Sequence, residues 1–247
     1  MKYILSFSGG KDSTWLLLEL IRRGYPLDEV IFFDTGWEYD VMYDHIDRCK
    51  RLCEDNGIKF VTLYPERSFD YMMFEHVTRS GKQGYSWCGG PCRWGTRLKI
   101  TAINKYIRRS GRCIVYVGIA ADELERLDRE QEYYKRFPLV DWGYTEEDCL
   151  QGCYNAGFDW GCMYDHLDRL SCKYCANKNL KELRNVRCYY PEVWCELKDY
   201  QTRTYRPYKG EGKSVFDLEK RFEFEDEIRR QGRTITRKEF FEELKRR

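Results

Sequence analysis

The first half of the chain alternates short hydrophobic runs with longer stretches in which hydrophobic positions recur every three or four residues. The longer stretches predict helices over residues 14–23 and 39–56, each followed by a glycine suited to a helix end. The short runs predict buried strands over residues 2–7, 30–33, 60–64 and 113–118. Because helices connect these strands, we expect a parallel, doubly wound α/β sheet that binds its ligand beyond the carboxyl ends of the strands.

The pattern changes after Pro138. Short helical stretches rich in Cys, Trp and Tyr follow, without a convincing strand, and Thr236 with Glu239 forms a capping box near the end. We therefore predict two parts, a nucleotide-binding α/β domain over residues 1–137 and a helical, cysteine-rich lobe over residues 138–247. We expect the two parts to share a bound metal.

Composition limits the size, the partners and the cellular location that we expect for this protein. The chain has 247 residues, of which 42% are hydrophobic, enough for one large domain with or without an appendage. Its 43 basic and 41 acidic residues nearly cancel, so nucleic acid would need a local patch, and no global field attracts an anionic membrane. We find no membrane-spanning run and no signal-peptide layout, and expect a cytoplasmic protein. The 12 cysteines then indicate thiols, metal ligands or catalysts instead of disulfides.

The strongest motif is Ser-Gly-Gly-Lys-Asp-Ser at residues 8–13, placed between the first predicted strand and the first helix. Gly9 and Gly10 permit a tight turn whose amides point at a phosphate, and the helix N-terminus adds positive potential. Lys11 contributes a charge, and Ser8 and Ser13 contribute hydroxyl donors. Asp12 fits beside phosphate if it helps to hold Mg²⁺. The alternative is an ordinary glycine-rich turn.

Two close cysteine pairs form the second signal. Cys88 and Cys92 are separated by three residues, and Cys172 and Cys175 by two, so four thiolates could surround one ion. Glycine and proline at residues 89–91 favour a turning ligand loop. Zinc and an iron–sulfur cluster both suit such a set, and buried, unligated cysteines are the alternative. We interpret the other cysteines mostly as packing residues, with Cys149, Cys153 and Cys162 as a reserve ligand set.

The motif at residues 8–13 resembles that of the PP-loop superfamily, which has an adenine nucleotide alpha hydrolase-like fold and cleaves ATP to an adenylate and pyrophosphate. Four further segments resemble the phosphoadenosine-phosphosulfate (PAPS) reductase family, namely residues 32–36, 87–99, 118–126 and 138–142. This resemblance implies that Phe33, Asp34 and Thr35 contact the adenosine and that Gly118 lies in a nucleotide-binding loop. It also implies catalytic roles beside the phosphates for five residues, Lys11, Asp12, Arg97, Lys99 and Arg126.

The sequence differs from the reductases of this family in two ways. Reductases of adenosine phosphosulfate hold a [4Fe-4S] cluster on an adjacent cysteine pair and a distant Cys-x2-Cys, whereas three residues separate the first pair here, which leaves cluster and zinc both open. Those reductases attack with a cysteine of the C-terminal tail, whereas no cysteine follows Cys195 here.

Three functions remain. The first is an ATP-dependent enzyme that activates a small-molecule or nucleic-acid acceptor, with a sulfur donor if sulfur is transferred. The second is a sulfonucleotide reductase with a thiol reductant, and the third is a non-catalytic nucleotide-binding module stapled by metal. Self-association as a homo-oligomer is left open.

Two other features have plain explanations. Residues 42–48 and 163–169 are nearly identical, which we attribute to chance or to a shared way of packing a helix, because the surrounding sequence does not repeat. Alternating rings and cations over residues 200–209 could contact nucleic acid, but a packed edge of the helical lobe is the better interpretation.

Overall fold

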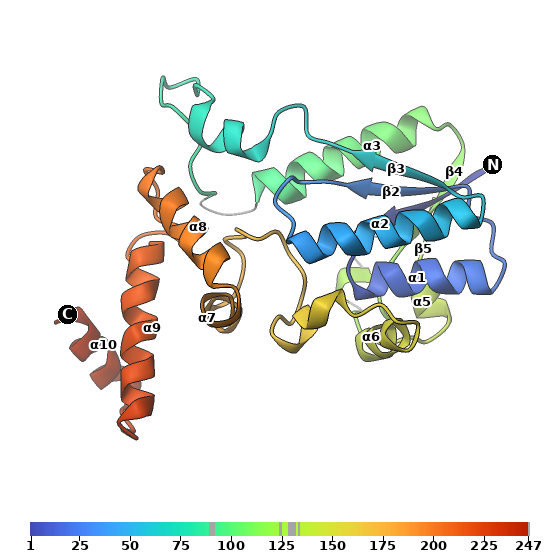
Figure 1. The fold of residues 1–247 in the computed structure, drawn as a ribbon. Coiled ribbons are helices and arrows are strands. Elements are labelled where there is room, and N and C mark those ends of the chain that lie inside the picture. The colour runs from blue at the N-terminus through green and yellow to red at the C-terminus, as the bar shows by residue number, and fades with distance from the viewer. Residues whose placement is uncertain (89–91, 124, 128–131, 133, 247) are drawn as a thin grey trace. The chain divides into compact units, whose positions relative to one another are not determined.

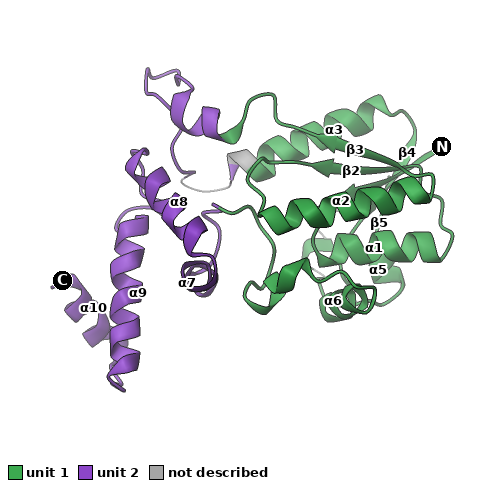
Figure 2. Ribbon diagram, viewed as in Figure 1, with its two compact units in different colours: residues 1–69, 93–173 green, residues 70–92, 174–247 purple. Residues whose placement is uncertain are grey.

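The computed structural model describes residues 1–88, 92–123, 125–127, 132 and 134–246, without the side chains of Arg93 and Trp94. The chain divides into two compact units (Figure 2). Unit 1 comprises Met1–Phe69 and Arg93–Lys173, and unit 2 comprises Asp70–Cys92 and Tyr174–Arg247. Each unit is described by itself.

A five-stranded, all-parallel sheet forms the centre of unit 1, which confirms the predicted α/β fold. Its strands run in the order β3-β2-β1-β4-β5. Their bounds are β1 Lys2–Phe7, β2 Glu29–Phe33, β3 Lys59–Leu63, β4 Cys113–Val117 and β5 Lys135–Arg136. All five residues of β2 are buried, as expected for a strand covered on both faces. The two-residue β5 pairs with β4 and was not predicted.

Helices cover both faces of this sheet, as a doubly wound fold requires. Strand order reverses at β1, since β2 and β3 lie to one side of it and β4 and β5 to the other. Right-handed crossovers then place α1 (Lys11–Arg22) and α2 (Asp40–Asp55) on one face and α3 (Lys99–Arg109) on the other, as Figure 1 shows. The core is hydrophobic, with Leu5 of β1 and Leu17 of α1 among its fully buried side chains. The reversal point lies beside the loop that follows β1, where ligands of such sheets bind.

Unit 1 extends past the expected boundary at residues 137 and 138. A π-helical turn, η2 (Arg93–Leu98), leads into α3, and after β5 come α5 (Pro138–Asp141), α6 (Glu146–Asn155) and the 3₁₀ segment η3 (Trp160–Asp165). Helix α6 packs on α1 so closely that a Cβ at Gly152 would lie 2.8 Å from the Trp15 ring. This contact places residues 138–173 with the sheet.

Unit 2 is helical and joins two separate parts of the chain. It contains a π-helical turn, η1 (Tyr71–Glu75), and the helices α7 (Leu180–Tyr189), α8 (Pro191–Thr202), α9 (Val215–Arg230) and α10 (Arg237–Lys245). Buried Trp194 and Phe222 contact one another in its core, and Arg184 pairs with Glu225. The capping box of Thr236 is confirmed at the start of α10. No helix of the described residues is long and apolar enough to cross a membrane.

Candidate nucleotide and cation site

Residues 8–13, here called the phosphate loop, lie between the end of β1 and the start of α1. Gly9 adopts a φ of +79°, and a Cβ there would come within 2.7 Å of Ile46 and 3.0 Å of Met42. Glycine is therefore required both by conformation and by space. Gly10 is the N-cap of α1 and is extended, with φ −79° and ψ 169°.

The two serine hydroxyls hold the phosphate loop in shape. The Oγ atoms of Ser8 and Ser13 lie 3.0 Å apart, and the Ser13 hydroxyl lies 3.0 Å from the carbonyl oxygen of Gly10. The Ser8 amide donates to Ser13 Oγ at 3.2 Å. Among the described residues, no acceptor reaches the amides of Asp12 and Ser13 at the first turn of α1. Such free amides at a helix N-terminus can bind an anion.

Lys11 points its ammonium group at carboxylates. Its Nζ lies 3.0 Å from Glu146 Oε2 and 3.7 Å from Asp12 Oδ1. Burial lowers the pKa of Lys11, but Asp12 and Glu146 outweigh burial and the net shift is upward. The lysine therefore carries its charge beside the phosphate loop. Burial, together with Glu146 and Glu123, raises the pKa of Asp12 to about 6 against the opposing effect of Lys11.

Three carboxylates from distant parts of unit 1 meet here. Oxygens of Asp12, Glu123 and Glu146 all lie within 4.8 Å of one another. Among the described residues, the buried Asp12 Oδ1 has no hydrogen-bond partner, although Lys11 Nζ lies 3.7 Å from it. An oxygen-only set of this kind suits a hard divalent cation such as Mg²⁺, which would also satisfy that orphaned atom. The donor set therefore fits the Mg²⁺ predicted for Asp12, and it adds two glutamates to it.

The end of β4 supports the phosphate loop directly. A Cβ at Gly118 would lie 2.9 Å from the backbone nitrogen of Ser13 and 3.0 Å from its Cα. Gly118 was expected to contact nucleotide, and the structure shows what its missing side chain permits, namely the close approach of the β4 end to the phosphate loop.

Two aromatic side chains of η3 form hydrogen bonds with the backbone of the phosphate loop. The Trp160 indole donates to the Gly9 carbonyl at 2.8 Å, and the Lys11 amide donates to the Tyr164 hydroxyl at 2.8 Å. The backbone of η3 is unusual, because φ is positive at Trp160, Gly161 and Cys162. Strain of this kind persists only where surrounding contacts enforce it.

His45 links α2 to this arrangement. Its Nε2 lies 3.0 Å from Thr14 Oγ1, and its ring packs on Trp160 with centroids 4.6 Å apart. Burial lowers the pKa of His45 to about 4, so the ring is neutral at pH 7. His45 and Tyr164 belong to the two nearly identical segments. The first is helical, whereas the second is partly 3₁₀, so a shared way of packing a helix is not the explanation.

The end of β2 uses its polar side chains within its own turn. Asp34 Oδ1 accepts from the Gly36 amide at 2.8 Å and from the Tyr43 hydroxyl at 3.0 Å. The Thr35 hydroxyl donates to Glu38 at 2.7 Å. The Phe33 side chain is buried in the core at 1% exposure, so only its main chain could face an adenosine.

The three predicted cations lie in unit 1 but differ in surroundings. Burial lowers the pKa of Lys99 against the raising effects of Glu38 and Cys172, and Arg126 lowers it further. Arg126 Nη1 lies 3.1 Å from both carboxylate oxygens of Glu123. Arg97 is exposed in η2. Arg126 thus contacts a carboxylate of the site, Lys99 lies near Glu38 and Arg126, and no contact among the described residues joins the Arg97 side chain to the site.

The cysteines predicted to bind metal are divided between the units. Cys172 belongs to unit 1, and Cys88, Cys92 and Cys175 belong to unit 2. Residues 89–91, predicted to form the turning loop, lie outside the described residues. Each of the four thiols is partly exposed, and Cys172 Sγ lies 4.0 Å from Glu38 Oε1. The four-thiolate site remains a prediction.

Packing accounts for only some of the other cysteines. It is confirmed for the four that are fully buried, Cys49, Cys53, Cys149 and Cys153. It is wrong for the exposed residues Cys162, Cys188 and Cys195. Burial raises the pKa of Cys149 and of Cys153, which disfavours their reserve role as thiolate ligands.

Sequence reasoning missed Glu146, Trp160 and Tyr164 as site residues. Each reaches the phosphate loop across more than 130 positions of sequence, with separations of 135, 151 and 153 residues. No local motif marks them. The duplicated segment containing Tyr164 was a signal, although its meaning was not evident.

Two comparisons relate this sequence to known proteins. An uncharacterized protein of Methanocaldococcus jannaschii is 25% identical over 213 residues, which cover 77% of this chain and 39% of that protein. The chain thus spans about two fifths of that relative. The phosphoadenosine phosphosulfate reductase domain matches residues 2–148, a segment that includes the phosphate loop and all three carboxylates. Because this match covers more than half of the chain, the protein belongs to the phosphoadenosine phosphosulfate reductase family of PP-loop proteins.

Proposed function

We propose that the protein is an enzyme that binds ATP at the phosphate loop and cleaves it to pyrophosphate and an adenylate carried by an acceptor. The observation that carries this proposal is the Asp12, Glu123 and Glu146 cluster beside a phosphate loop with free helix amides. A sulfonucleotide brings less charge to the loop than a triphosphate does. Cation-binding carboxylates next to the loop therefore favour a triphosphate.

The residues divide the work as follows. The amides of Asp12 and Ser13 and the Lys11 ammonium bind the pyrophosphate portion, while the backbone at Phe33, Asp34 and Thr35 faces the adenosine. Mg²⁺, when held by the three carboxylates, supplies positive charge that neutralises the phosphates. Binding requires the Lys11 ammonium to exchange its contact with Glu146 for a phosphate oxygen.

The chemical step is a displacement at the α-phosphorus. An acceptor oxygen forms a bond to that phosphorus as the bond to the bridging oxygen breaks, and pyrophosphate leaves with the electron pair. Lys99 and Arg126, with Arg97 as a third candidate, stabilise the negative charge that develops on the α-phosphate oxygens. In a sulfur transfer, the sulfur nucleophile then displaces AMP from the acceptor.

The proposal includes a metal held by Cys88, Cys92, Cys172 and Cys175, either a [4Fe-4S] cluster or Zn²⁺. Its support is the spacing of the two pairs in the sequence. Anaerobic purification followed by metal analysis and an absorption spectrum tests it. Broad absorbance at roughly 400 nm is expected of a cluster. A colourless protein with one zinc assigns the metal a structural role, and a protein without either removes this part of the proposal.

The test of nucleotide choice is calorimetric titration with ATP, adenosine phosphosulfate and PAPS, each with and without Mg²⁺. ATP is expected to bind most tightly and to require Mg²⁺. Lys11→Ala should weaken ATP binding, whereas Lys50→Ala on the exposed side of α2 should not. Tighter binding of a sulfonucleotide, or ATP binding that ignores Mg²⁺, contradicts the proposal.

Turnover is then followed with ATP labelled in the α-phosphate, by release of pyrophosphate and AMP in the presence of candidate acceptors and a sulfide donor. A sulfonucleotide reductase is the second candidate, because the family match is to a reductase domain and Cys195 is exposed on α8. That candidate predicts sulfite release from PAPS or adenosine phosphosulfate with a thiol, lost in Cys195→Ser. Absence of sulfite removes it.

A further inference from the structure

The charges of this protein are segregated along the chain, although its formal net charge is only +2. Acidic residues number 41 in 247, yet none occurs between Glu75 and Asp122. The part of this interval that belongs to unit 1 carries seven cations, namely Arg93, Arg97, Lys99, Lys105, Arg108, Arg109 and Arg112. Helix α3 lies in the middle of this run and contains no carboxylate of its own.

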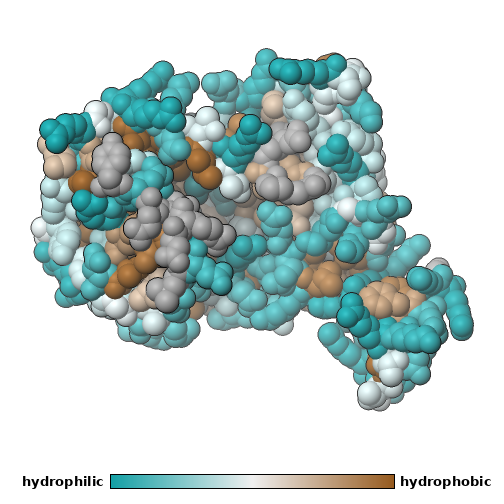
Figure 3. Space-filling view, turned by 180° about the vertical axis from the view of Figure 1, so that it is seen from behind, coloured by the Kyte–Doolittle hydropathy of each residue, from teal (hydrophilic) through white to brown (hydrophobic). Residues whose placement is uncertain are grey.

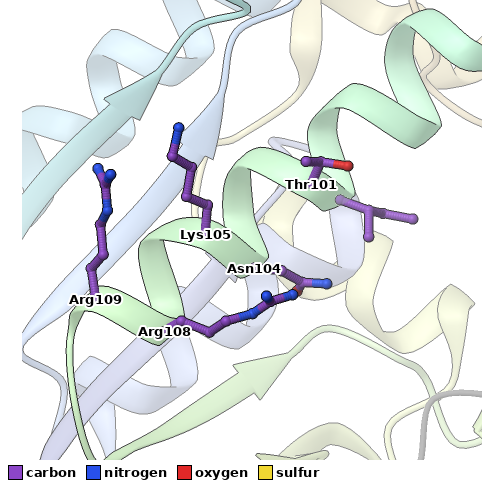
Figure 4. Close-up of a pocket in the computed structure, with 6 residues that line it drawn as sticks. Thr101, Asn104, Lys105, Arg108 and Arg109 are labelled. Atoms are coloured by element: carbon purple, nitrogen blue, oxygen red, sulfur yellow. The ribbon is translucent and has the colours of Figure 1, made fainter.

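The packing of α3 determines which side chains face outward. Ile103 and Ile107 are each 8% exposed and form its buried face. The Tyr106 hydroxyl donates to Glu29 Oε2 at 2.9 Å, which fixes the rotation of the helix against the sheet. Since residues three and four apart share a helix face, Lys105 and Arg109 lie together on the outer side, as Figure 4 shows.

This outer side has a shallow depression of about 440 Å³, lined by Ile100, Thr101, Asn104, Lys105, Arg108 and Arg109. Among the described residues, no carboxylate lies within 4.0 Å of Arg108 or Arg109. Lys105 lies 4.0 Å from Glu66, but both side chains are well exposed and such a pair contributes little. By contrast, Arg22 at the end of α1 and Arg23 directly after it both pair with Glu19. Within the described residues, the two guanidinium groups on this face of α3 thus have no carboxylate partner, and the only one of Lys105 is the exposed Glu66.

We propose that this outer face of α3 binds the phosphate backbone of a double-stranded nucleic acid. Guanidinium groups engage phosphate oxygens two at a time, and Thr101 and Asn104 supply the hydroxyl and amide donors that accompany Arg and Lys in backbone contacts. The 11 residues of α3 extend about 16 Å, alongside which a duplex presents roughly ten phosphates. The match is one of charge and length, and it reads no base sequence.

The composition of the face selects this partner over two others. None of the six lining residues is aromatic, so the face has no rings on which the bases of a single strand could stack. A membrane-binding helix would need a broad apolar side, whereas Ile100 is the one hydrophobic residue of the six. Figure 3 shows hydrophilic side chains around the hydrophobic patches of the surface seen from behind.

The face also adjoins the candidate active site. Helix α3 begins at Lys99, whose pKa is lowered by burial and, against the raising effects of Glu38 and Cys172, by Arg126, the residue that pairs with Glu123 of that site. A duplex on α3 therefore has one end near residues proposed to act on the α-phosphate. Binding itself requires neither ATP nor its cleavage, so it is tested separately from the proposed reaction.

The experiment uses the full chain, purified anaerobically, and fluorescein-labelled 20-base-pair DNA and RNA duplexes of arbitrary sequence. Anisotropy is measured between 50 and 200 mM KCl. The test variant is Arg108→Glu with Arg109→Glu, and the matched control is Lys50→Glu with Arg51→Glu. Both pairs are consecutive, exposed and helical and change the net charge equally, but the control pair lies on α2, across the sheet.

The parent protein is expected to bind at low salt, with a linear dependence of log Kd on log salt concentration. The test variant should weaken binding at least tenfold, and the control less than about twofold. Arg108→Ala with Arg109→Ala should reduce the salt slope by about two, one for each lost phosphate contact. Thermal unfolding and ATP titration of every variant establish that the fold and the nucleotide site are retained.

Equal weakening by the test and control pairs overturns the proposal, because it would reflect net charge alone. Tighter binding of a single strand than of either duplex, or binding to vesicles of anionic phospholipid that survives in competition with duplex, also overturns it. If the duplex binds through α3 while ATP does not bind, the proposal stands and the proposed function fails.

Discussion

Gly118→Ala tests whether the end of β4 shapes the phosphate loop. Gly118 does not have a positive φ, so alanine is compatible with its backbone, and the whole effect must come from the added methyl group. That methyl would lie 2.9 Å from the Ser13 nitrogen, and ordinary contact begins at 3.4 Å, so the loop must move by about 0.5 Å. The neighbouring atoms are backbone atoms and cannot rotate away.

The expected consequence is a loss of nucleotide affinity. Functional sites must hold their groups to within about 0.5 Å, and a misplacement of 1 Å lowers rates about a hundredfold. A loop shift at that limit should therefore weaken binding roughly tenfold, equivalent to about 1.4 kcal/mol. The assay is calorimetric titration with the adenine nucleotide that the parent binds most tightly. Stability should fall by about 1–3 kcal/mol, as in other overpacked interiors.

The matched control is Gly111→Ala at the other end of β4. Gly111 has a φ of +75° and no heavy atom within 4 Å of its added Cβ. Alanine there should lower stability by about 1–2 kcal/mol through backbone strain and leave affinity unchanged. An affinity of Gly118→Ala within twofold of the parent's, or an equal loss of affinity in Gly111→Ala, would refute the reasoning.

Three further predictions concern the surroundings of the site. Because the pKa of His45 is lowered from 6.5 to about 4, the unfolded chain takes up a proton that the folded chain does not. The free energy of unfolding should therefore fall by on the order of 3 kcal/mol as the pH drops from about 7 to 4. In His45→Gln, the thermal unfolding temperature should depend less on pH over that range. If it depends on pH as strongly as in the parent, another group causes the effect. Tyr164→Phe leaves the first amide of α1 without its acceptor and should lower the free energy of unfolding in urea by about 1–3 kcal/mol. Tyr154→Phe should have little effect, because no hydrogen bond to the Tyr154 hydroxyl occurs among the described residues. Cys172→Ser should reduce bound metal measured by mass spectrometry, and Cys188→Ser should not; full metal content in the first variant rules out the proposed thiolate set.

The parts of the fold that follow from local pattern could be predicted from the sequence. The strands β1 to β4 are hydrophobic runs of five or six residues, and the helices between them repeat with the period of an α-helix. The two charged residues of β5 carry no such pattern. The boundary of unit 1 depends on α6 packing against α1, a tertiary contact that neither segment reveals alone.

In the candidate site, too, local motifs could be predicted from the sequence and long-range contacts could not. The phosphate loop was predictable because its six residues are consecutive and each has a physical role. Glu146 and Tyr164 were not, because an isolated glutamate or tyrosine in a helical stretch is common, and only the folded chain brings these residues to Lys11. Gly118 was predicted to contact the nucleotide, and the structure shows a different role, since its missing side chain leaves room for the loop backbone.

The long-range hydrogen bonds of the phosphate loop affect the point during synthesis at which the protein can bind its nucleotide. The loop is synthesised before Trp160 and Tyr164, and its contacts with them join residues 151 and 153 positions apart. When residues 2–148, the segment of the family match, have just left the ribosome, both aromatic partners are still missing. Ligand binding during synthesis should therefore begin abruptly once η3 has left the ribosome, which makes nucleotide capture a marker for completion of unit 1.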